Sequence, residues 1–178
     1  MLHKKKLVFL PVILGLAILP ISAYLIYSES FYWDKAYFMP PIAYTGGIPV
    51  RNDHYGEGEF GAKRRGGRRH KGIDITAGVG EPVMAAKGGI AEAKEQKQGM
   101  GKYVVIRHKK GLSTLYGHLS EINIKAVQRV RQGDIIGLVG KTGNANYNDM
   151  RAHLHFEVRL DGEAVNPRNF LDAGNNDE

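Results

Sequence analysis

Histidine and aspartate side chains recur in this sequence at spacings that could bring them to one surface. His70 and Asp74 lie four residues apart, and in an extended segment an even step places both side chains on the same face. The segment 153–158 alternates strictly, so His153 and His155 share one face with Glu157 while three apolar residues take the other. Such a cluster of imidazoles and carboxylates could bind a metal ion.

Three of these side chains would suit zinc. Two imidazoles and one carboxylate bind Zn²⁺ well and leave a fourth position for water, and His70, Asp74 and His155 would supply that set. His118, which closes a short apolar run, and His153 would flank the open position. A metal there would lower the pKa of its bound water to about 7. The chain has no cysteine, so any metal must be held by His, Asp or Glu.

The other three histidines, which are His3, His54 and His108, are interpreted as ordinary surface or structural residues. His108 shares a face with Val104 and Ile106, which suits a structural hydrogen bond at the end of a strand. A His-x-His pair alone would be as often structural as ligating. Its combination with His-x-x-x-Asp and a fourth histidine, in a chain without cysteine, favours the metal interpretation.

Beyond the histidines, the segment 60–167 resembles the lysostaphin-type (LytM-like) zinc endopeptidases that cut peptidoglycan peptides. The resemblance covers about three-fifths of the chain, and three histidine motifs in this order make it specific. The matching motifs are His70-x-x-x-Asp74, Pro82-Val83-x-Ala85, Gly101-x-Tyr103-Val104-Val105-Ile106-x-His108, Tyr116-x-His118-Leu119-Ser120, Gly133-x-x-Ile136-Gly137-x-Val139-Gly140 and His153-Leu154-His155-Phe156-Glu157.

The resemblance implies a zinc site on an antiparallel β-core. By motif match, His70, Asp74 and His155 would be the metal ligands, and His118 and His153 would be catalytic. This chain departs from the family at residues 144–152, where the family usually has a shorter, Ser-Thr-Gly-like stretch. The departure bears on one wall of the groove and on substrate choice, rather than on the metal site.

Composition places the chain among ordinary globular proteins. Its 178 residues are 43% hydrophobic and 24% charged, which leaves room for one domain and a short appendage. Of the net charge of +7, three charges belong to Lys4–Lys6, so the rest of the chain carries 25 − 3 = 22 basic and 18 acidic groups. That balance could favour an anionic partner. No zinc-finger, RNA-binding or basic-helix motif is present, so no nucleic-acid partner is expected.

The N-terminus predicts a membrane anchor. Residues 1–6 carry three lysines, and residues 7–27 are uncharged over a length that could cross a bilayer as a helix. The alternative is a cleaved signal peptide, whose apolar core is normally about 7–15 residues long and ends at a small-residue site. Here the run is longer, and residues 21–23 match such a site poorly. We therefore expect a single-pass protein of the bacterial cytoplasmic (inner) membrane, with its catalytic domain on the outer, periplasmic side.

The rest of the chain predicts an all-β fold, an antiparallel β-sandwich or open barrel. Short β-prone runs broken by glycine recur every eight to twelve residues, which is typical of such folds. The expected strands are 72–76, 82–86, 103–108, 112–119, 135–139 and 154–160, with short helices near 122–127 and 167–171. Residues 28–50, rich in proline and glycine, predict a linker, 51–171 the peptidase domain, and 172–178 a frayed tail.

Two further motifs carry less weight. Residues 137–142 resemble a phosphate-binding P-loop, but Ile135 stands where that loop needs glycine, and a loop follows instead of a helix. The basic run 63–69 is interpreted as a solvated turn or as plain positive charge near an anionic envelope, with attraction of substrate carboxylates as the functional alternative. Glu157 could support the site or be a solvated structural carboxylate.

Together these features predict a membrane-anchored zinc metalloendopeptidase that hydrolyses amide bonds in peptidoglycan peptides or cross-links. The alternative is a catalytically silent peptidoglycan-binding or regulatory protein on the same fold. A silent relative would be expected to lose ligands, whereas all three ligands and both accessory histidines are present here. The expected partners are peptidoglycan and, through a single N-terminal helix, the membrane; the sequence is silent on protein partners.

Overall fold

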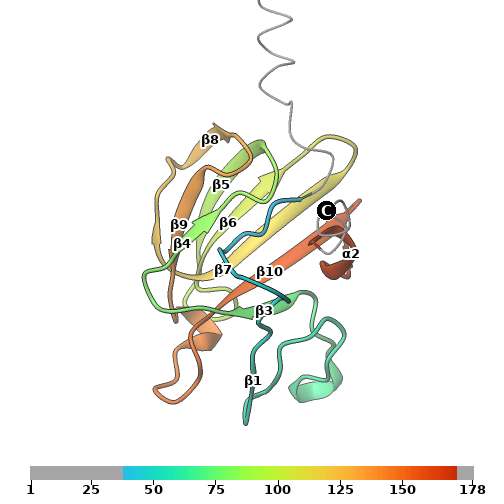
Figure 1. The fold of residues 1–178 in the computed structure, drawn as a ribbon, viewed down its shortest axis with the longest axis vertical. Helices are drawn as coiled ribbons and strands as arrows, with labels where there is room; N and C mark the ends of the chain where they lie inside the picture. The colour runs from blue at the N-terminus through green and yellow to red at the C-terminus, as the bar shows by residue number, and fades with distance from the viewer. Residues whose placement is uncertain (1–37, 172–178) are drawn as a thin grey trace, which may run out of the picture. The chain divides into compact units, whose positions relative to one another are not determined.

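An antiparallel sheet of nine strands forms the body of the chain in the computed structural model, which describes residues 38–171 (Figure 1). Its main path runs β11-β10-β7-β6-β5-β8, with β3 beside β10 and with β9 beside both β7 and β4. The elements are β1 (Asn52–Asp53), β2 (Gly56–Glu57), η1 (Arg65–Gly67), β3 (Ile73–Thr76), β4 (Pro82–Met84), β5 (Gly89–Glu95), β6 (Lys102–Arg107), β7 (Leu112–Ile122), β8 (Val127–Val130), β9 (Ile135–Val139), η2 (Gly143–Ala145), β10 (His153–Leu160), β11 (Glu163–Val165) and α2 (Arg168–Leu171). The described part of the chain is therefore mostly β-sheet, as expected.

The long strand β7 joins two parts of this sheet. Residues 112–117 pair with β10, and residues 113–119 pair with β6. Residues 119–122 pair with β9 after a shift of register. At the change of partner, His118 adopts a left-handed φ of 64° and donates its N–H to the carbonyl of Met100 at 2.8 Å. The register of β7 with β6 also shifts between Tyr116 and Leu119, and this irregularity, of the kind that re-aims side chains beside active sites, includes one of the predicted catalytic residues.

The two faces of β10 have different roles. Leu154, Phe156 and Val158 are fully buried in the hydrophobic core, where the Phe156 ring lies 5.3 Å from that of Tyr116. Burying each such side chain contributes about 1.5–3 kcal/mol. The alternate positions of the same strand carry histidine and glutamate on the other face. The core therefore fixes the strand that carries the polar site.

Residues 38–50, predicted as a linker, belong to the packed domain. Phe38, Ile42 and Ile48 are 3%, 2% and 9% exposed. The backbone of this segment is anchored as well, because the N–H of Met39 donates to Ala86 at 3.0 Å and the carbonyl of Pro41 accepts a hydrogen bond at 2.8 Å. The boundary at residue 51 was therefore wrong. Proline and glycine keep the segment out of regular secondary structure, while its apolar residues pack against the core.

Phe38 provides a test of this packing. Its ring lies 5.1 Å from that of Phe170, so Phe38→Ala should lower the free energy of unfolding by about 3–5 kcal/mol, as large-to-small core substitutions do. Chemical denaturation monitored by circular dichroism would measure the change. Val79→Ala, at a site that is 63% exposed, is the matched control and should change stability little. Equal stability of the two variants would contradict the packing of this segment.

Other expectations had mixed outcomes. The six predicted strands are present, and the helix near 167–171 is confirmed as α2, where the side chain of Asn166 accepts the N–H of Arg168 at 3.1 Å. The helix near 122–127 was wrong, because β7 continues to Ile122 and β8 begins at Val127. Strand pairing with β5 and β9 overrides any local preference there. The strands β1, β2, β5, β8 and β11 were not anticipated.

The predicted membrane segment at residues 7–27 and the tail at residues 172–178 lie outside the described residues. Among residues 38–171, no helix is long and apolar enough to cross a membrane.

Candidate active site

Two neighbouring strands bring the predicted carboxylate and one imidazole together. In the antiparallel pairing of β3 with β10, Asp74 lies directly opposite His155. Both side chains are on the polar face of β10, and both residues are buried, at 3% and 7% exposure. The Oδ1 atom of Asp74 lies 2.8 Å from Nδ1 of His155. The alternating apolar residues of β3 and β10 fix the strand register, and the register sets this contact.

His70 reaches the same point from the turn before β3. Its backbone N–H donates to Ala62 at 2.9 Å, and its ring Nδ1–H donates to the carbonyl of Glu59 at 2.8 Å. Gly72 lets the chain approach β10 closely, because a Cβ there would lie 2.3 Å from the carbonyl oxygen of Phe156. With Nδ1 committed to a carbonyl, His70 presents the lone pair of Nε2 to the site.

The three candidate ligand atoms form a small triangle. Nε2 of His70 lies 3.0 Å from Nδ1 of His155 and 3.1 Å from Oδ1 of Asp74, and the third edge is 2.8 Å. Tetrahedral zinc with bonds of about 2.0–2.1 Å would separate its ligands by about 3.3 Å. The triangle thus needs to open by only a few tenths of an ångström. Two nitrogens and one carboxylate oxygen, aimed at one point, fit a zinc ion.

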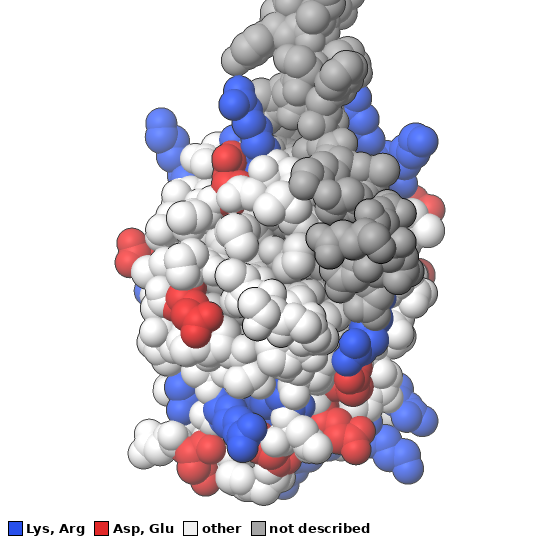
Figure 2. All heavy atoms as spheres, viewed as in Figure 1, with Lys and Arg blue, Asp and Glu red and all other residues white. Residues whose placement is uncertain are grey.

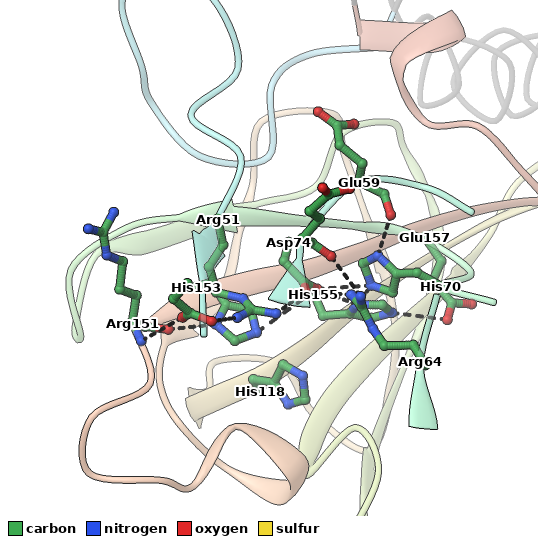
Figure 3. A network of polar contacts seen from close by, with 12 residues as sticks. Arg51, Glu59, Arg64, His70, Asp74, His118, Arg151, His153, His155 and Glu157 are labelled. Atoms are coloured by element: carbon green, nitrogen blue, oxygen red, sulfur yellow. Dashed lines mark hydrogen bonds and ion pairs between the residues drawn. The ribbon is translucent and has the colours of Figure 1, made fainter. Parts of the chain in front are cut away.

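The far side of His155 is also organised (Figure 3). Its Nε2–H donates to Oε1 of Glu157 at 3.0 Å, and Glu157 in turn accepts two hydrogen bonds from the guanidinium of Arg159 at 2.8 and 2.6 Å. Hydrogen bonds of this kind orient metal-binding histidines and fix their tautomer. Glu157, whose role the sequence left open, therefore supports the ring of His155.

Charge around His155 favours its protonated form in the metal-free protein. Burial alone would lower its pKa, but hydrogen bonds to Asp74 and Glu157 raise the pKa to about 9. Burial would raise the pKa of Asp74, yet the hydrogen bond from His155 holds it well below its usual value. Near pH 7 the metal-free site is therefore a buried ion pair, and a proton occupies the nitrogen that a metal would need.

Metal binding should consequently release that proton. Because the pKa of His155 is about 9, each zinc bound at pH 7 should displace about one proton from it, and affinity should fall as the pH decreases below 9. Calorimetric titration in buffers of different ionisation enthalpy counts the protons. In Glu157→Gln, which removes one of the two negative charges that favour the protonated ring, the count attributable to His155 should fall. An unchanged count would show that the proton comes from elsewhere.

His118 is a residue of β7 and lies beside the three candidate ligands. It directly follows Gly117, which pairs with His155. Its ring centroid is 5.8 Å from that of His155 and 5.1 Å from that of His153. Nδ1–H donates to the carbonyl of Thr142 at 2.9 Å, so Nε2 carries the lone pair. Burial, together with the neighbouring His155 and His153, lowers its pKa to about 3, and the ring is neutral at physiological pH.

His153 has the same arrangement on β10. Its Nδ1–H donates to the carbonyl of Arg151 at 2.7 Å, and Nε2 lies 4.0 Å from Oδ1 of Asp74, too far for a hydrogen bond. Burial lowers its pKa, so this ring too is neutral near pH 7. The structure therefore brings together all five predicted site residues, and His118 and His153 each keep a lone pair on Nε2.

Two arginines that sequence analysis did not assign to the site also reach Asp74. Its second carboxylate oxygen, Oδ2, accepts hydrogen bonds from Arg51 at 3.0 Å and Arg64 at 3.2 Å. Arg64 belongs to the basic run 63–69, for which the sequence suggested either a solvated turn or attraction of substrate. Arg64 has neither role here, because its guanidinium is hydrogen-bonded to Asp74. No motif in the sequence marks Arg51 as part of the site. Its position beside Asp74 depends on the isolated β-bridge between Val50 and Ile75, which the sequence does not reveal.

The unusual stretch 144–152 lies against the β1–β2 hairpin. The hydroxyl of Tyr55 donates to Asp149 at 2.6 Å, and the rings of Tyr55 and Tyr147 are 5.0 Å apart. Asp53 accepts the N–H of Arg151 at 3.3 Å. Charged side chains of both signs gather at the end of the domain that carries β1 (Figure 2). The departure from the family pattern is therefore tied to a hairpin that lies outside the family motifs.

An antiparallel β-domain that carries a candidate His-Asp-His metal site and two neutral histidines has the features of a metallopeptidase. Residues 68–167 match the model of Peptidase family M23, and the chain belongs to this family. It is 45% identical over 100 residues to the DD-carboxypeptidase/endopeptidase Mpg of Neisseria meningitidis, covering 56% of this chain and 22% of that one. It is 39% identical over 104 residues to Stage II sporulation protein Q of Bacillus subtilis, covering 57% and 36%.

Among solved structures, the catalytic domain of lysostaphin from Staphylococcus simulans superposes with a TM-score of 0.56 at 32% identity, over 64% of this chain and 89% of that domain. The resemblance to lysostaphin-type peptidases is thereby confirmed. The chain spans about a fifth to a third of the length of the two curated relatives, so the similarity concerns only a part of each.

Proposed function

We propose that this chain is a zinc-dependent endopeptidase that hydrolyses amide bonds in peptidoglycan peptides or cross-links. The observation that carries the proposal is the arrangement of five buried side chains. Three ligand atoms converge within 3.1 Å of one another, and two neutral histidines stand beside them. Membership of the M23 family supports the substrate class.

The chemistry divides between the metal position and the two free histidines. Zinc held by His70, Asp74 and His155 supplies a Lewis acid for the scissile carbonyl and for a water molecule. His118 and His153 each have Nδ1 committed to a backbone carbonyl, so each can accept a proton at Nε2. Once protonated, such a ring can donate to the oxyanion or deliver the proton to the leaving amine. The backbone carbonyls fix the tautomers that this requires.

The test uses the full chain, purified in detergent and loaded with zinc. Incubated with peptidoglycans of defined cross-link and stem composition, it should release soluble fragments whose masses identify the cleaved amide bond. Turnover should disappear on chelation and return with zinc. A protein that binds one zinc per chain but releases no fragment from any peptidoglycan would instead be the silent binding or regulatory protein on this fold.

We further propose that residues 7–27 anchor the protein in the cytoplasmic membrane, with the peptidase domain outside. The support is the uncharged length of this segment behind three lysines. N-terminal sequencing of protein extracted from membranes should find the segment intact, and protease added outside the membrane should reach the domain. A mature N-terminus near Tyr24 would favour cleavage as a signal peptide.

A further inference from the structure

The two oxygens of the Asp74 carboxylate face different partners (Figure 3). Oδ1 lies 3.1 Å from His70 and 2.8 Å from His155, on the side where a metal fits. Oδ2 turns away and accepts hydrogen bonds from Arg51 and Arg64. A carboxylate with both oxygens free could bind a metal through one or both of them. Here the second oxygen is already committed.

Arg51 is built into this position. Its backbone N–H donates to the carbonyl of Asp74 at 2.8 Å, and its carbonyl accepts the N–H of Gly58 at 2.7 Å. The guanidinium is a fork, with Nη2 on Asp74 and Nη1 in an ion pair with Asp53, and its side chain is 4% exposed. A buried arginine fork fixes geometry better than a point charge would, because its donors are planar and rigid.

Arg64 approaches the same oxygen from the basic run. Its Nη2 donates to Asp74 at 3.2 Å, and its Nη1 donates to the carbonyl of Glu57 at 2.7 Å. The side chain is 22% exposed, so it is the less buried half of the pair. Its neighbour Arg65 is exposed and makes no side-chain contact with Asp74, which provides a matched control on the same turn.

We propose that Arg51 and Arg64 are positioning residues that hold Asp74 as a one-oxygen metal ligand. Both precede residue 68, where the match to the family begins. By holding Oδ2 they fix the rotation of the carboxylate, keep the metal's coordination number low, and so preserve an open position for water. The inference rests on the metal site of the proposed function and adds the residues that set its geometry.

Two effects of the arginines oppose each other, which makes the proposal testable. Their positive charge repels a dication and should weaken metal binding, whereas their hydrogen bonds orient the ligand and should strengthen it. If orientation dominates, Arg51→Met should bind zinc about 10–100-fold more weakly, as the loss of other groups that orient metal ligands does. Arg51→Lys keeps the charge but loses the fork, and it should also bind more weakly. Arg64→Met should show a smaller loss, and Arg65→Met none.

The experiment measures zinc affinity of the full chain by competition with a chromophoric chelator, and the visible spectrum of the cobalt(II) form. Release of Oδ2 should let both carboxylate oxygens bind, so the low-coordinate cobalt absorption should weaken in Arg51→Met and Arg64→Met but persist in Arg65→Met. Circular dichroism of the metal-free variants checks folding. Because Arg51 is buried, Arg64→Met decides the matter if Arg51→Met fails to fold.

The outcomes separate the two proposals. Wild-type affinity in Arg51→Lys would mean that charge alone suffices, and tighter binding in Arg51→Met would mean that repulsion dominates; either result overturns the positioning role. An unchanged spectrum and affinity in Arg64→Met would remove Arg64 from it. If the wild-type chain itself binds neither zinc nor cobalt, the metal site of the proposed function fails, and the positioning role falls with it.

Discussion

Alanine at His70, Asp74 or His155 should abolish stoichiometric zinc binding, and peptidoglycan turnover should fall to background. Three protein ligands are the usual complement of a catalytic zinc, and the site has no cysteine to replace a lost one. The three ligand atoms lie within 3.1 Å of one another, so each removal leaves two donors and a space. Zinc content after dialysis, measured by mass spectrometry of the metal, gives the result directly.

The control is His54→Ala. The side chain of His54 is 63% exposed and pairs with Asp149 rather than with the site, so this variant should retain one zinc per chain. Removing Asp74 or His155 also breaks the buried ion pair of the metal-free protein, which would leave a charge unpaired and lower stability. Folding of each variant is therefore checked by circular dichroism. Full zinc occupancy in a folded variant would remove that residue from the ligand set.

Alanine at His118 or His153 should separate metal binding from chemistry. Neither ring is needed to complete the three-ligand site, so zinc should remain near one per chain. Each substitution removes a proton acceptor at Nε2, and general acid–base groups contribute about 10²–10⁴-fold. We expect kcat to fall by that order for each variant, and by much less than the product of the two effects for the double variant, because residues that act as a unit are not additive.

The prediction for His153→Ala carries the greater risk of a structural side effect. Only Leu154 separates His153 from the ligand His155, so its loss could disturb the strand. Zinc stoichiometry and turnover must be measured on the same preparations. Turnover at the wild-type rate would disprove a catalytic role for the residue concerned. Loss of zinc would show instead that the residue is a ligand or holds one in place.

The candidate site was predictable because its signals are local. Alternation along 153–158 places His153 and His155 on one face, and the structure confirms this segment as part of strand β10. Since the same strand must bury Leu154, Phe156 and Val158, the face available to the histidines is fixed before any tertiary contact is known. The β-prone runs between glycines are local signals too, and six strands were predicted from them.

What could not be predicted depends on contacts between distant segments. Arg51 reaches Asp74 across 23 positions of sequence, and no periodicity marks it. The proline- and glycine-rich segment before it reads as a linker, because composition does not reveal that its apolar residues have a surface to cover. The edge strand β8 was missed because it is only four residues long and only Val130 in it is buried, so its structure depends on pairing with β5.

The packed segment 38–50 has a practical consequence for anyone who transfers this peptidase module to another protein. A fusion joined at residue 68, where the family match begins, would carry the complete ligand set and both catalytic candidates. It would also leave bare the apolar surface that Phe38, Ile42 and Ile48 cover, and it would lack the guanidinium groups that hold Asp74. Such a chimera should aggregate or lose its metal readily. A fusion joined ahead of Phe38 should remain folded and keep its metal site.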